Sequence, residues 1–412
     1  MANHSILLLL LLFNCFRVFS QQETSSDELY KQARSAAFEA KDYDKAIDLS
    51  RKALKQSPDY TELSVFLGRL YTWSEKIDSA RYVFQGLEDK GVRNEDFFLA
   101  YGSLEYWENE NTRAANIVDK GLQAHENSEP LLLLRAKIAQ DNKQYTLAAE
   151  SLNRLISLNP DNSDARSLLA SIQDFTSKNS IGVTYNFVHF DKQFDDNWHA
   201  MSLSYKRLTP IGSAIIRANV ARRFARSGSQ LELEMYPRIS NVFYLYAGIG
   251  VSTTPGIFPK FRSGLSLYAN LPHSFEGEIG YRQLRFDSNI WMYTASVGKY
   301  YKNLWFNLRT FLTPDKDLIS HSYAGTIRYY NKGANDYIGL MFGTGISPEG
   351  NLNNLLDYET FKLKTYKVGA DYNFSIKKSN IFSISGIYYN QEFRPGERGN
   401  QFDLTLGYIR TF

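Results

Sequence analysis

The chain has 412 residues, a formal net charge of only +3 and a single cysteine, Cys15. A charge this small, without a concentrated basic stripe, argues against a nucleic-acid binder. One cysteine, placed so early, excludes a disulfide scaffold, a zinc–thiolate site and cysteine catalysis in a mature chain that has lost it.

The first twenty residues have the pattern of a secretory signal peptide. An apolar run extends from Ile6 to Phe13, and Val18 and Ser20 stand at positions −3 and −1 relative to Gln21. The run is too short to span a bilayer as a stable helix. We therefore expect a signal peptide over residues 1–20, removed by cleavage after Ser20, and a short linker over residues 21–26.

Residues 27 to about 160 repeat with a period of 34, within a helical domain predicted over residues 27–176. Small residues recur at this interval in two columns, and Tyr43 and Tyr145 share a third. The first column is Ala46, Ala80, Ala114 and Ala148. The second is Gly68, Gly102 and Ala136, and the first repeat departs from it because it has Arg34 at this position. This register resembles the tetratricopeptide repeat, whose paired helices need a small residue where they cross closely. The pattern predicts an α-solenoid of four repeats, closed by a capping helix over residues 163–175.

Two tryptophans occupy one position in successive repeats. Trp73 and Trp107 lie 34 residues apart, with Arg69 and Tyr106 nearby. The position predicts a surface that faces the groove of the solenoid, where aromatic rings would bind a sugar or a partner peptide. The alternative is that both tryptophans wedge between repeats as core residues, and the sequence leaves both interpretations open.

From residue 179 to residue 412 apolar and polar residues alternate, which is typical of strands. Segments of ten to thirteen residues have the length of tilted membrane strands. We count about fourteen, with twelve as the alternative because the turns at 224–229 and 287–289 are weakly marked. Aromatic residues, among them 28 Tyr and 27 Phe, gather mainly after residue 180 and suit the aromatic girdles of such a barrel. The predicted fold is thus an α + β two-domain chain, an α-solenoid followed by an antiparallel transmembrane β-barrel.

Charged residues in these segments fall on the face assigned to the interior, where they avoid hydrocarbon and line a polar lumen. The predicted lumen residues are Lys206, Arg217, Glu232, Glu234, Glu276, Glu278, Arg282, Arg309, Arg328 and Asp403. They would form either a cross-strand network that stiffens and narrows the barrel or a solute-selective constriction. At the end of the chain, Tyr408 and Phe412 resemble the signal that outer-membrane insertion machinery reads.

The sequence predicts no enzyme, metal site or cofactor. None of the six histidines pairs with another at a spacing of two, three or four residues, and no nucleophile elbow or phosphate loop is present. The carboxylate pair Glu232 and Glu234, like Glu276 and Glu278, is explained by ion pairing in the lumen.

The segment from about residue 178 to the terminal aromatic, with its ending Leu406-Gly407-Tyr408, resembles the YaiO family of outer-membrane proteins. Leu70-Tyr71-Thr72-Trp73-Ser74, before Ala80, is similar to the repeats that precede such barrels. The architecture is also similar to the exporter of poly-N-acetylglucosamine, whose periplasmic repeats guide a sugar polymer into an outer-membrane barrel. That exporter's barrel is larger, which argues against a wide open pore here.

These resemblances imply a transport or secretion component for an exopolysaccharide or related glycan, with the repeats as receptor. The alternative is a structural scaffold that anchors periplasmic partners at the outer membrane. Either function places the barrel in the outer membrane of a Gram-negative bacterium and the repeats in the periplasm. The expected partners are outer-membrane lipid, the barrel-assembly machinery, and a polysaccharide or periplasmic protein in the repeat groove.

Overall fold

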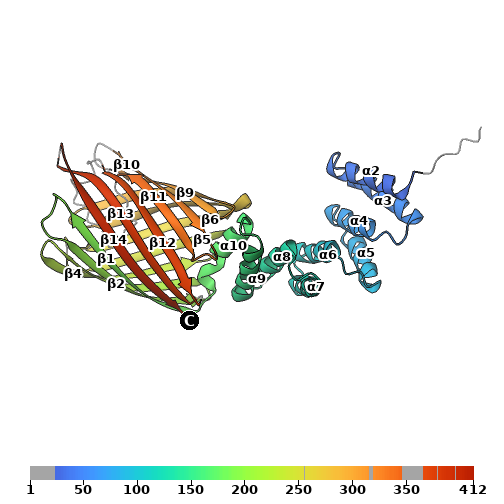
Figure 1. The fold of residues 1–412 in the computed structure, drawn as a ribbon, viewed down its shortest axis with the longest axis horizontal. Helices are drawn as coiled ribbons and strands as arrows, with labels where there is room; N and C mark the ends of the chain where they lie inside the picture. The colour runs from blue at the N-terminus through green and yellow to red at the C-terminus, as the bar shows by residue number, and fades with distance from the viewer. Residues whose placement is uncertain (1–23, 255, 315–318, 346–364, 378, 395) are drawn as a thin grey trace, which may run out of the picture. The chain divides into compact units, whose positions relative to one another are not determined.

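The computed structural model describes residues 24–412 except 255, 315–318, 346–364, 378 and 395. The signal peptide expected over 1–20, and the first part of the linker expected over 21–26, lie outside the described residues. Within the described part, nine α-helices precede fourteen strands (Figure 1). The helices are α2 (Ser26–Phe38), α3 (Tyr43–Gln56), α4 (Thr61–Trp73), α5 (Ile77–Asp89), α6 (Glu95–Trp107), α7 (Asn111–Ala124), α8 (Glu129–Asp141), α9 (Tyr145–Leu158) and α10 (Ser163–Ile172).

The described residues form two compact units, one ending at Glu126 and one running from Asn127 to Phe412. Helices α2–α7 make up the first unit. The second unit holds α8–α10, a short 3₁₀ helix η1 (Gln173–Phe175) and all the strands. The change from helix to strand comes later, between η1 and the first strand at Asn179.

The 34-residue period places small side chains where paired helices meet. Ala46, Ala80, Ala114 and Ala148 are all completely buried in the second helices of their pairs. At Gly68 in α4, an added Cβ would lie only 2.5 Å from the Phe84 ring of α5. Close helix packing at this crossing therefore requires glycine. In the same column Arg34 is exposed in the first repeat and lies over the rings of Tyr30 and Phe38.

The turn within each helix pair has the same backbone in every repeat. Lys41, Glu75, Asn109 and Lys143, spaced 34 residues apart, all adopt a positive φ of between 54° and 61°. A left-handed residue just after a helix lets the chain reverse toward the next one. The 34-residue period is therefore seen in the backbone conformation as well as in the sequence, because a left-handed residue occupies the same position after the first helix of each pair.

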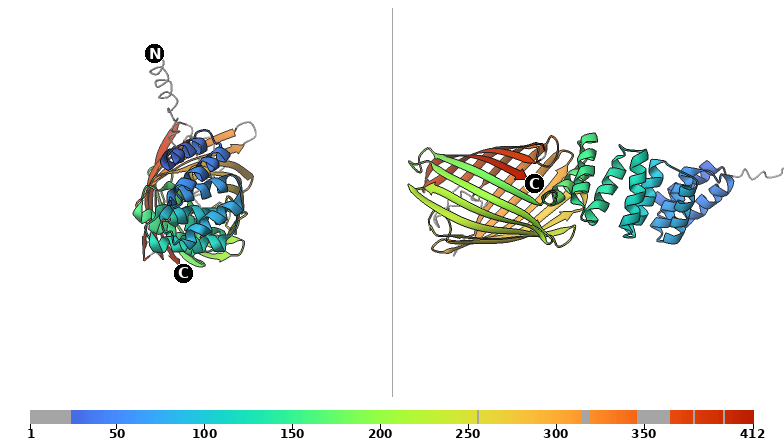
Figure 2. Two further views of the ribbon diagram at one scale, coloured as in Figure 1. Left: turned by 90° about the vertical axis from the view of Figure 1, so that its right-hand side faces the viewer. Right: turned by 90° about the horizontal axis from the view of Figure 1, so that it is seen from below.

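The fourteen described strands form one closed antiparallel barrel, in which each strand pairs with its neighbours in sequence and β1 closes on β14. Figure 2 shows the strands tilted along the barrel. The predicted count of fourteen is confirmed. The strands are β1 (Asn179–Phe190), β2 (Trp198–Thr209), β3 (Gly212–Arg223), β4 (Arg226–Pro237), β5 (Phe243–Ser252), β6 (Phe261–Leu271), β7 (Phe275–Arg285), β8 (Asn289–Tyr301), β9 (Leu304–Pro314), β10 (Ile319–Tyr330), β11 (Tyr337–Thr344), β12 (Thr365–Ile376), β13 (Asn380–Arg394) and β14 (Glu397–Thr411).

One turn that the sequence marked weakly is a tight hairpin. Phe224 and Ala225 join β3 to β4, and both have positive φ, 52° and 57°. A two-residue hairpin of this type needs positive φ at both positions, which usually selects asparagine or glycine. The turn forms here without those residues, so composition alone marked it poorly.

The two faces of the barrel differ in the way that a membrane requires. Aliphatic side chains such as Leu203, Leu233, Ile249 and Leu308 are exposed on the outer face, while charged residues alternate with them inward. So large an exposed apolar surface is rare on a water-soluble monomer and is the expected outer face of a membrane barrel. Among the described residues, no helix is long and apolar enough to cross a membrane.

We call the barrel end that carries Asn179 and Phe412 the near end, and the opposite end the far end. At the near end the backbone amides of Asn179 and Phe412 each donate to the other residue's carbonyl at 2.9 Å. The Tyr408 hydroxyl donates to Asn380 Oδ1 at 2.9 Å. The backbone bonds of Phe412 thus complete the seam between β14 and β1, while Tyr408 links β14 to β13.

Candidate functional site

The interior of the barrel carries a belt of ion pairs. All ten residues predicted for the lumen lie on strand positions that alternate with exposed outer-face residues. Arg217 on β3 binds Glu232 and Glu234 on β4 at 3.1 and 3.0 Å. The pairing register sets Arg217 directly opposite Glu232, so strand geometry alone brings these charges together.

A second group of charges in the belt centres on Glu278 of β7. Glu278 Oε1 accepts from Arg282 at 3.3 Å and from the Ser266 hydroxyl at 2.7 Å. Its other oxygen, Oε2, forms an ion pair with Arg309 at 2.8 Å. Only 3% of Glu278 is exposed. A carboxylate this buried needs these donors, because a buried charge without partners is strongly destabilising.

Two residues of the belt were not among those predicted. Arg262 on β6 donates to Glu232 at 2.8 Å, and Asp371 on β12 lies 3.7 Å from Arg328. Both lie on inward positions of their strands, so the alternation of apolar and polar residues could also have predicted that they face the lumen. Three predicted residues remain. Lys206 and Asp403 lie on inner positions of β2 and β14, where Asp403 accepts from the Gln401 side-chain amide at 2.7 Å. Glu276 on β7 accepts from the indole nitrogen of Trp305 at 2.8 Å.

A collar of aromatic rings lines the near half of the lumen. It is formed by inward side chains close to the near ends of β4, β5, β6, β8, β9, β10 and β11. Its members are Tyr236, Tyr244, Tyr246, Tyr268, Tyr300, Trp305, Tyr330 and Tyr337. The aromatic content of the sequence predicted membrane girdles and not this inner set, although the inward position of each ring in the alternation marks it.

The collar rings contact one another and the charged belt. Tyr244 and Tyr268 stack with centroids 4.8 Å apart, and Tyr330 and Tyr337 lie 5.3 Å apart. The Arg328 guanidinium lies over the Tyr337 ring at 4.4 Å, and Arg282 lies over Tyr246 at 4.5 Å. This wall offers flat apolar faces interleaved with hydroxyl, guanidinium and carboxylate groups, a combination that suits amphipathic ligands.

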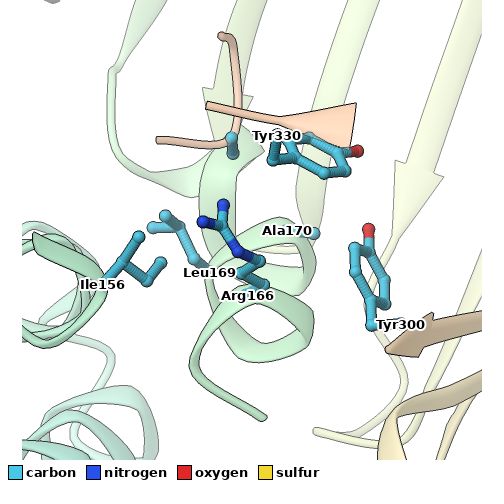
Figure 3. Close-up of a pocket in the computed structure, with 7 residues that line it drawn as sticks. Ile156, Arg166, Leu169, Ala170, Tyr300 and Tyr330 are labelled. Atoms are coloured by element: carbon cyan, nitrogen blue, oxygen red, sulfur yellow. The ribbon is translucent and has the colours of Figure 1, made fainter. Parts of the chain in front are cut away.

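Helix α10 lies against the near end, beside the collar. Figure 3 shows Arg166 of α10 reaching toward Tyr330, with Tyr300 close by. The Arg166 guanidinium donates to the carbonyl oxygen of Lys332 at 2.9 Å and lies 5.8 Å from the centre of the Tyr330 ring. Burial lowers the pKa of Arg166, yet arginine stays charged because its ordinary pKa is above about 12.

Other polar contacts join α8–α10 and η1 to the near-end turns. The Ser274 hydroxyl donates to Asp164 at 2.6 Å, and Lys302 pairs with Asp161 at 3.1 Å. The Gln173 amide bonds to Asn335, and the Asn241 amide bonds to Asp141. These contacts reach the turns after β4, β6, β8 and β10, so the helices are held against four of the turns at this end of the barrel.

The two tryptophans of the repeats have different surroundings. Trp73 packs with Phe38, Tyr43 and Phe66 at centroid distances of 5.8, 6.0 and 6.4 Å. Trp107 is 57% exposed. The sequence explains the difference, because the positions 34 residues after those three rings hold the smaller Thr72, Ile77 and Ala100.

The other two residues predicted for the repeat surface also differ. Arg69 forms an ion pair with Asp96 and retains 26% side-chain exposure. Tyr106, next to Trp107, is half-buried. Of the four predicted residues, Trp107 therefore presents the most open aromatic face.

Within the part of the chain that the structure describes, no group of three or more His, Cys, Asp and Glu residues gathers in a metal-binding arrangement. The imidazole of His199 lies 2.7 Å from the Tyr185 hydroxyl on the outer face of the barrel. The features of the lumen that could contact a ligand are its ion pairs and its aromatic rings.

Comparison with known families finds a match within each part of the chain. Residues 178–350 match the model of the YaiO membrane beta barrel domain, and residues 37–104 match that of a tetratricopeptide repeat. The chain carries a YaiO membrane β-barrel domain. The predicted resemblance to YaiO barrels preceded by repeats is thereby confirmed, and the chain is an outer-membrane-type β-barrel with tetratricopeptide repeats.

Solved structures resemble the helical part. A tetratricopeptide-repeat protein of Thermus thermophilus is 18% identical, with a TM-score of 0.32, over 36% of this chain and 81% of that one. A repeat protein from Parabacteroides merdae is 17% identical, with a TM-score of 0.33, over 37% and 62%. PilW, a type IV pilus biogenesis factor, is 21% identical, with a TM-score of 0.33, over 37% and 70%. No curated protein matches the chain.

Proposed function

We propose that this protein passes a glycan across the outer membrane, with the repeats as its periplasmic receptor. The observation that carries the proposal is the aromatic collar at the near end of the lumen. Sugar rings have apolar faces and hydroxyl rims. Tyrosine and tryptophan rings match the faces, while the neighbouring Arg328, Arg282 and Glu276 match the rims.

The repeats complete the proposed path. Repeat arrays form extended binding surfaces, and Trp107 presents an open ring on this one. The proposed orientation places the near end in the periplasm and the far end at the cell surface. The assembly machinery would then read Tyr408 and Phe412, and outer-membrane lipid would cover the barrel wall. This role involves no catalysis and no cofactor.

Single-channel conductance with oligosaccharides tests the proposal. The full chain in a planar bilayer should conduct ions, and N-acetylglucosamine oligomers added on the near side should block the current. Tyr330→Ala removes a collar ring and should raise the blocking concentration several-fold. Tyr329→Ala is the matched control, because this neighbouring ring is 49% exposed on the outer face. A channel that conducts but is blocked equally in both variants would contradict the role of the collar.

A second candidate is a scaffold that anchors periplasmic partners at the outer membrane. It is supported by the ion-pair belt, which joins neighbouring strands inside the barrel, and by the polar contacts that fix α10 to the near-end turns. A rigid barrel is sufficient to hold a repeat array at the membrane. The full chain would then show no conductance, and repeat-dependent capture of a periplasmic protein would replace glycan blocking as the measurable activity.

A further inference from the structure

The outer wall of the barrel is hollowed toward its far end. A groove of about 550 Å³ crosses β2, β3 and β4, with Tyr185 of β1 at one edge. Met201 and Val220 line it as apolar side chains and are 46% and 52% exposed. Ser227 and Ser229 of β4 add only short side chains. The wall is therefore concave here, and Met201 and Val220 give the groove an apolar lining.

The floor of the groove is supported from inside the barrel. Its inward positions hold Ala200, Ala221 and Gly228, against which the loop residues Ile257 and Phe258 are packed. An added Cβ at Gly228 would lie 3.0 Å from the Cβ of Ile257. The loop thus fills the space behind the small residues. The groove is a fixed feature of the wall because its floor is close-packed.

A cationic group stands at the far-end edge of the groove. Arg222 points outward, directly opposite His199 in the strand register, and is exposed. No carboxylate in the described part of the chain pairs with it. Arg222 is the next-to-last residue of β3, so it lies where the apolar belt meets the headgroup layer, and an outward arginine costs little there. His199 and the Tyr185 hydroxyl, 2.7 Å apart, add hydrogen-bonding groups beside it.

We infer that this groove binds one phosphorylated lipid of the surrounding leaflet. An acyl chain would lie along Met201 and Val220, and a lipid phosphate would accept hydrogen bonds from Arg222 and His199. The position supports this occupant, because a ligand lying in the bilayer must offer hydrocarbon to the wall and an anion to the edge. Only the choice of leaflet depends on the orientation proposed above for the barrel. With the repeats in the periplasm it is the outer leaflet, and the ligand is its phosphorylated glycolipid.

Native mass spectrometry of the full chain, stripped of lipid in detergent, tests the inference. Bisphosphorylated lipid A is the probe, and its dephosphorylated form is the comparison. The unmodified chain should bind one copy of the phosphorylated form preferentially. Arg222→Gln should weaken that binding roughly tenfold, as expected for the loss of a charged hydrogen bond. Met201→Trp should weaken it as strongly by filling the groove while leaving Arg222 in place.

Arg285→Gln is the matched control. Arg285 also points outward and ends β7 at the far end, but it lies outside the groove. Equal losses for Arg222→Gln and Arg285→Gln, unchanged binding in Met201→Trp, or equal affinity for the dephosphorylated lipid would each overturn the inference. Heat-modifiable migration on gels checks that each variant has folded. Conductance is a separate measurement. A negative result for lipid binding would therefore not contradict the glycan proposal, and a negative result for glycan blocking would not contradict the lipid site.

Discussion

Glu278 shows how single residues control the barrel interior. It forms ion pairs with Arg282 and Arg309 and accepts a hydrogen bond from the Ser266 hydroxyl. Replacing one partner of a buried ion pair costs about 3–5 kcal/mol, because the remaining charges keep their desolvation penalty. We therefore expect Glu278→Ala to lower the free energy of unfolding by about that amount, measured by guanidinium unfolding followed by tryptophan fluorescence.

The control for Glu278→Ala is an exposed ion pair between two far-end loops. Asp287 lies 3.0 Å from Lys260 and its side chain is 98% exposed. Exposed ion pairs contribute roughly 0–1 kcal/mol, so Asp287→Ala should change stability little. Equal effects of the two substitutions would mean that the lumen is well hydrated and that the belt does not stiffen the barrel.

The tryptophans give a second prediction at this scale. Trp73→Ala should destabilise the repeats by about 3–5 kcal/mol, because it removes a ring from an aromatic cluster. Trp107→Ala should leave the melting temperature nearly unchanged and weaken the binding of N-acetylglucosamine oligomers, measured by calorimetry. The interpretation of Trp107 as a ligand contact would fail if Trp107→Ala bound the oligomers as well as the unmodified chain did.

At the scale of residues, the sequence predicted which face of a strand a side chain lies on better than it predicted the ion-pair partner of that side chain. Alternation assigned Arg217 and Glu232 to one face because the side-chain period of a strand is two. It did not identify Asp371 as the partner of Arg328, because that contact skips the strand between them. The collar was missed for a related reason. Aromatic content was attributed to the membrane interfaces, while the inward position of each ring was not followed along the chain.

At the scale of elements, replacing two glycines of neighbouring helices with alanine should change the stability of the repeats in opposite directions. Gly68 in α4 has the Phe84 ring 2.5 Å from the position of an added Cβ, whereas Gly86 in α5 has open space there. Gly68→Ala should destabilise the repeats by about 1–3 kcal/mol through overpacking. Gly86→Ala should stabilise them by about 1 kcal/mol, because alanine is the better helix former.

Thermal unfolding followed by circular dichroism at 222 nm measures both glycine substitutions. Each serves as the control for the other, since the chemical change is the same and only the surroundings differ. A gain in stability at Gly68 would show that α4 and α5 cross less closely than the structure has them.

Helices and strands were predictable because both periods are regular. The helix pairs follow the 34-residue columns, and the fourteen strands follow the alternation. The β3–β4 turn was the weak point, because Phe224 and Ala225 adopt a backbone that their side chains disfavour. The capping helix was expected at the end of the repeats. Its contacts with the barrel were not expected, because they join residues more than one hundred positions apart, as in Ser274 and Asp164.

At the scale of the whole molecule, α8–α10 share a compact unit with the barrel. Arg166, Asp164 and Asp161 bond to turns between strands. The strand ladder closes on itself between β1 and β14 and does not depend on these helices. Insertion should therefore need only the barrel, while the helices should affect how stable and how open its near end is.

Two shortened chains separate these roles, each with the signal peptide joined to residue 127 or to residue 179. Both should insert and show heat-modifiable migration, because a closed ladder satisfies every backbone group of the wall. The chain that starts at residue 179 lacks the polar contacts of α10, so it should convert to the unfolded band at a lower temperature. It should also conduct more, since Tyr300 and Tyr330 lose the cover of Arg166. Equal conductance and equal melting would mean that α10 does not hold the near-end turns in the membrane. Failure of only the shorter chain to insert would mean that the helices are part of the folding unit of the barrel.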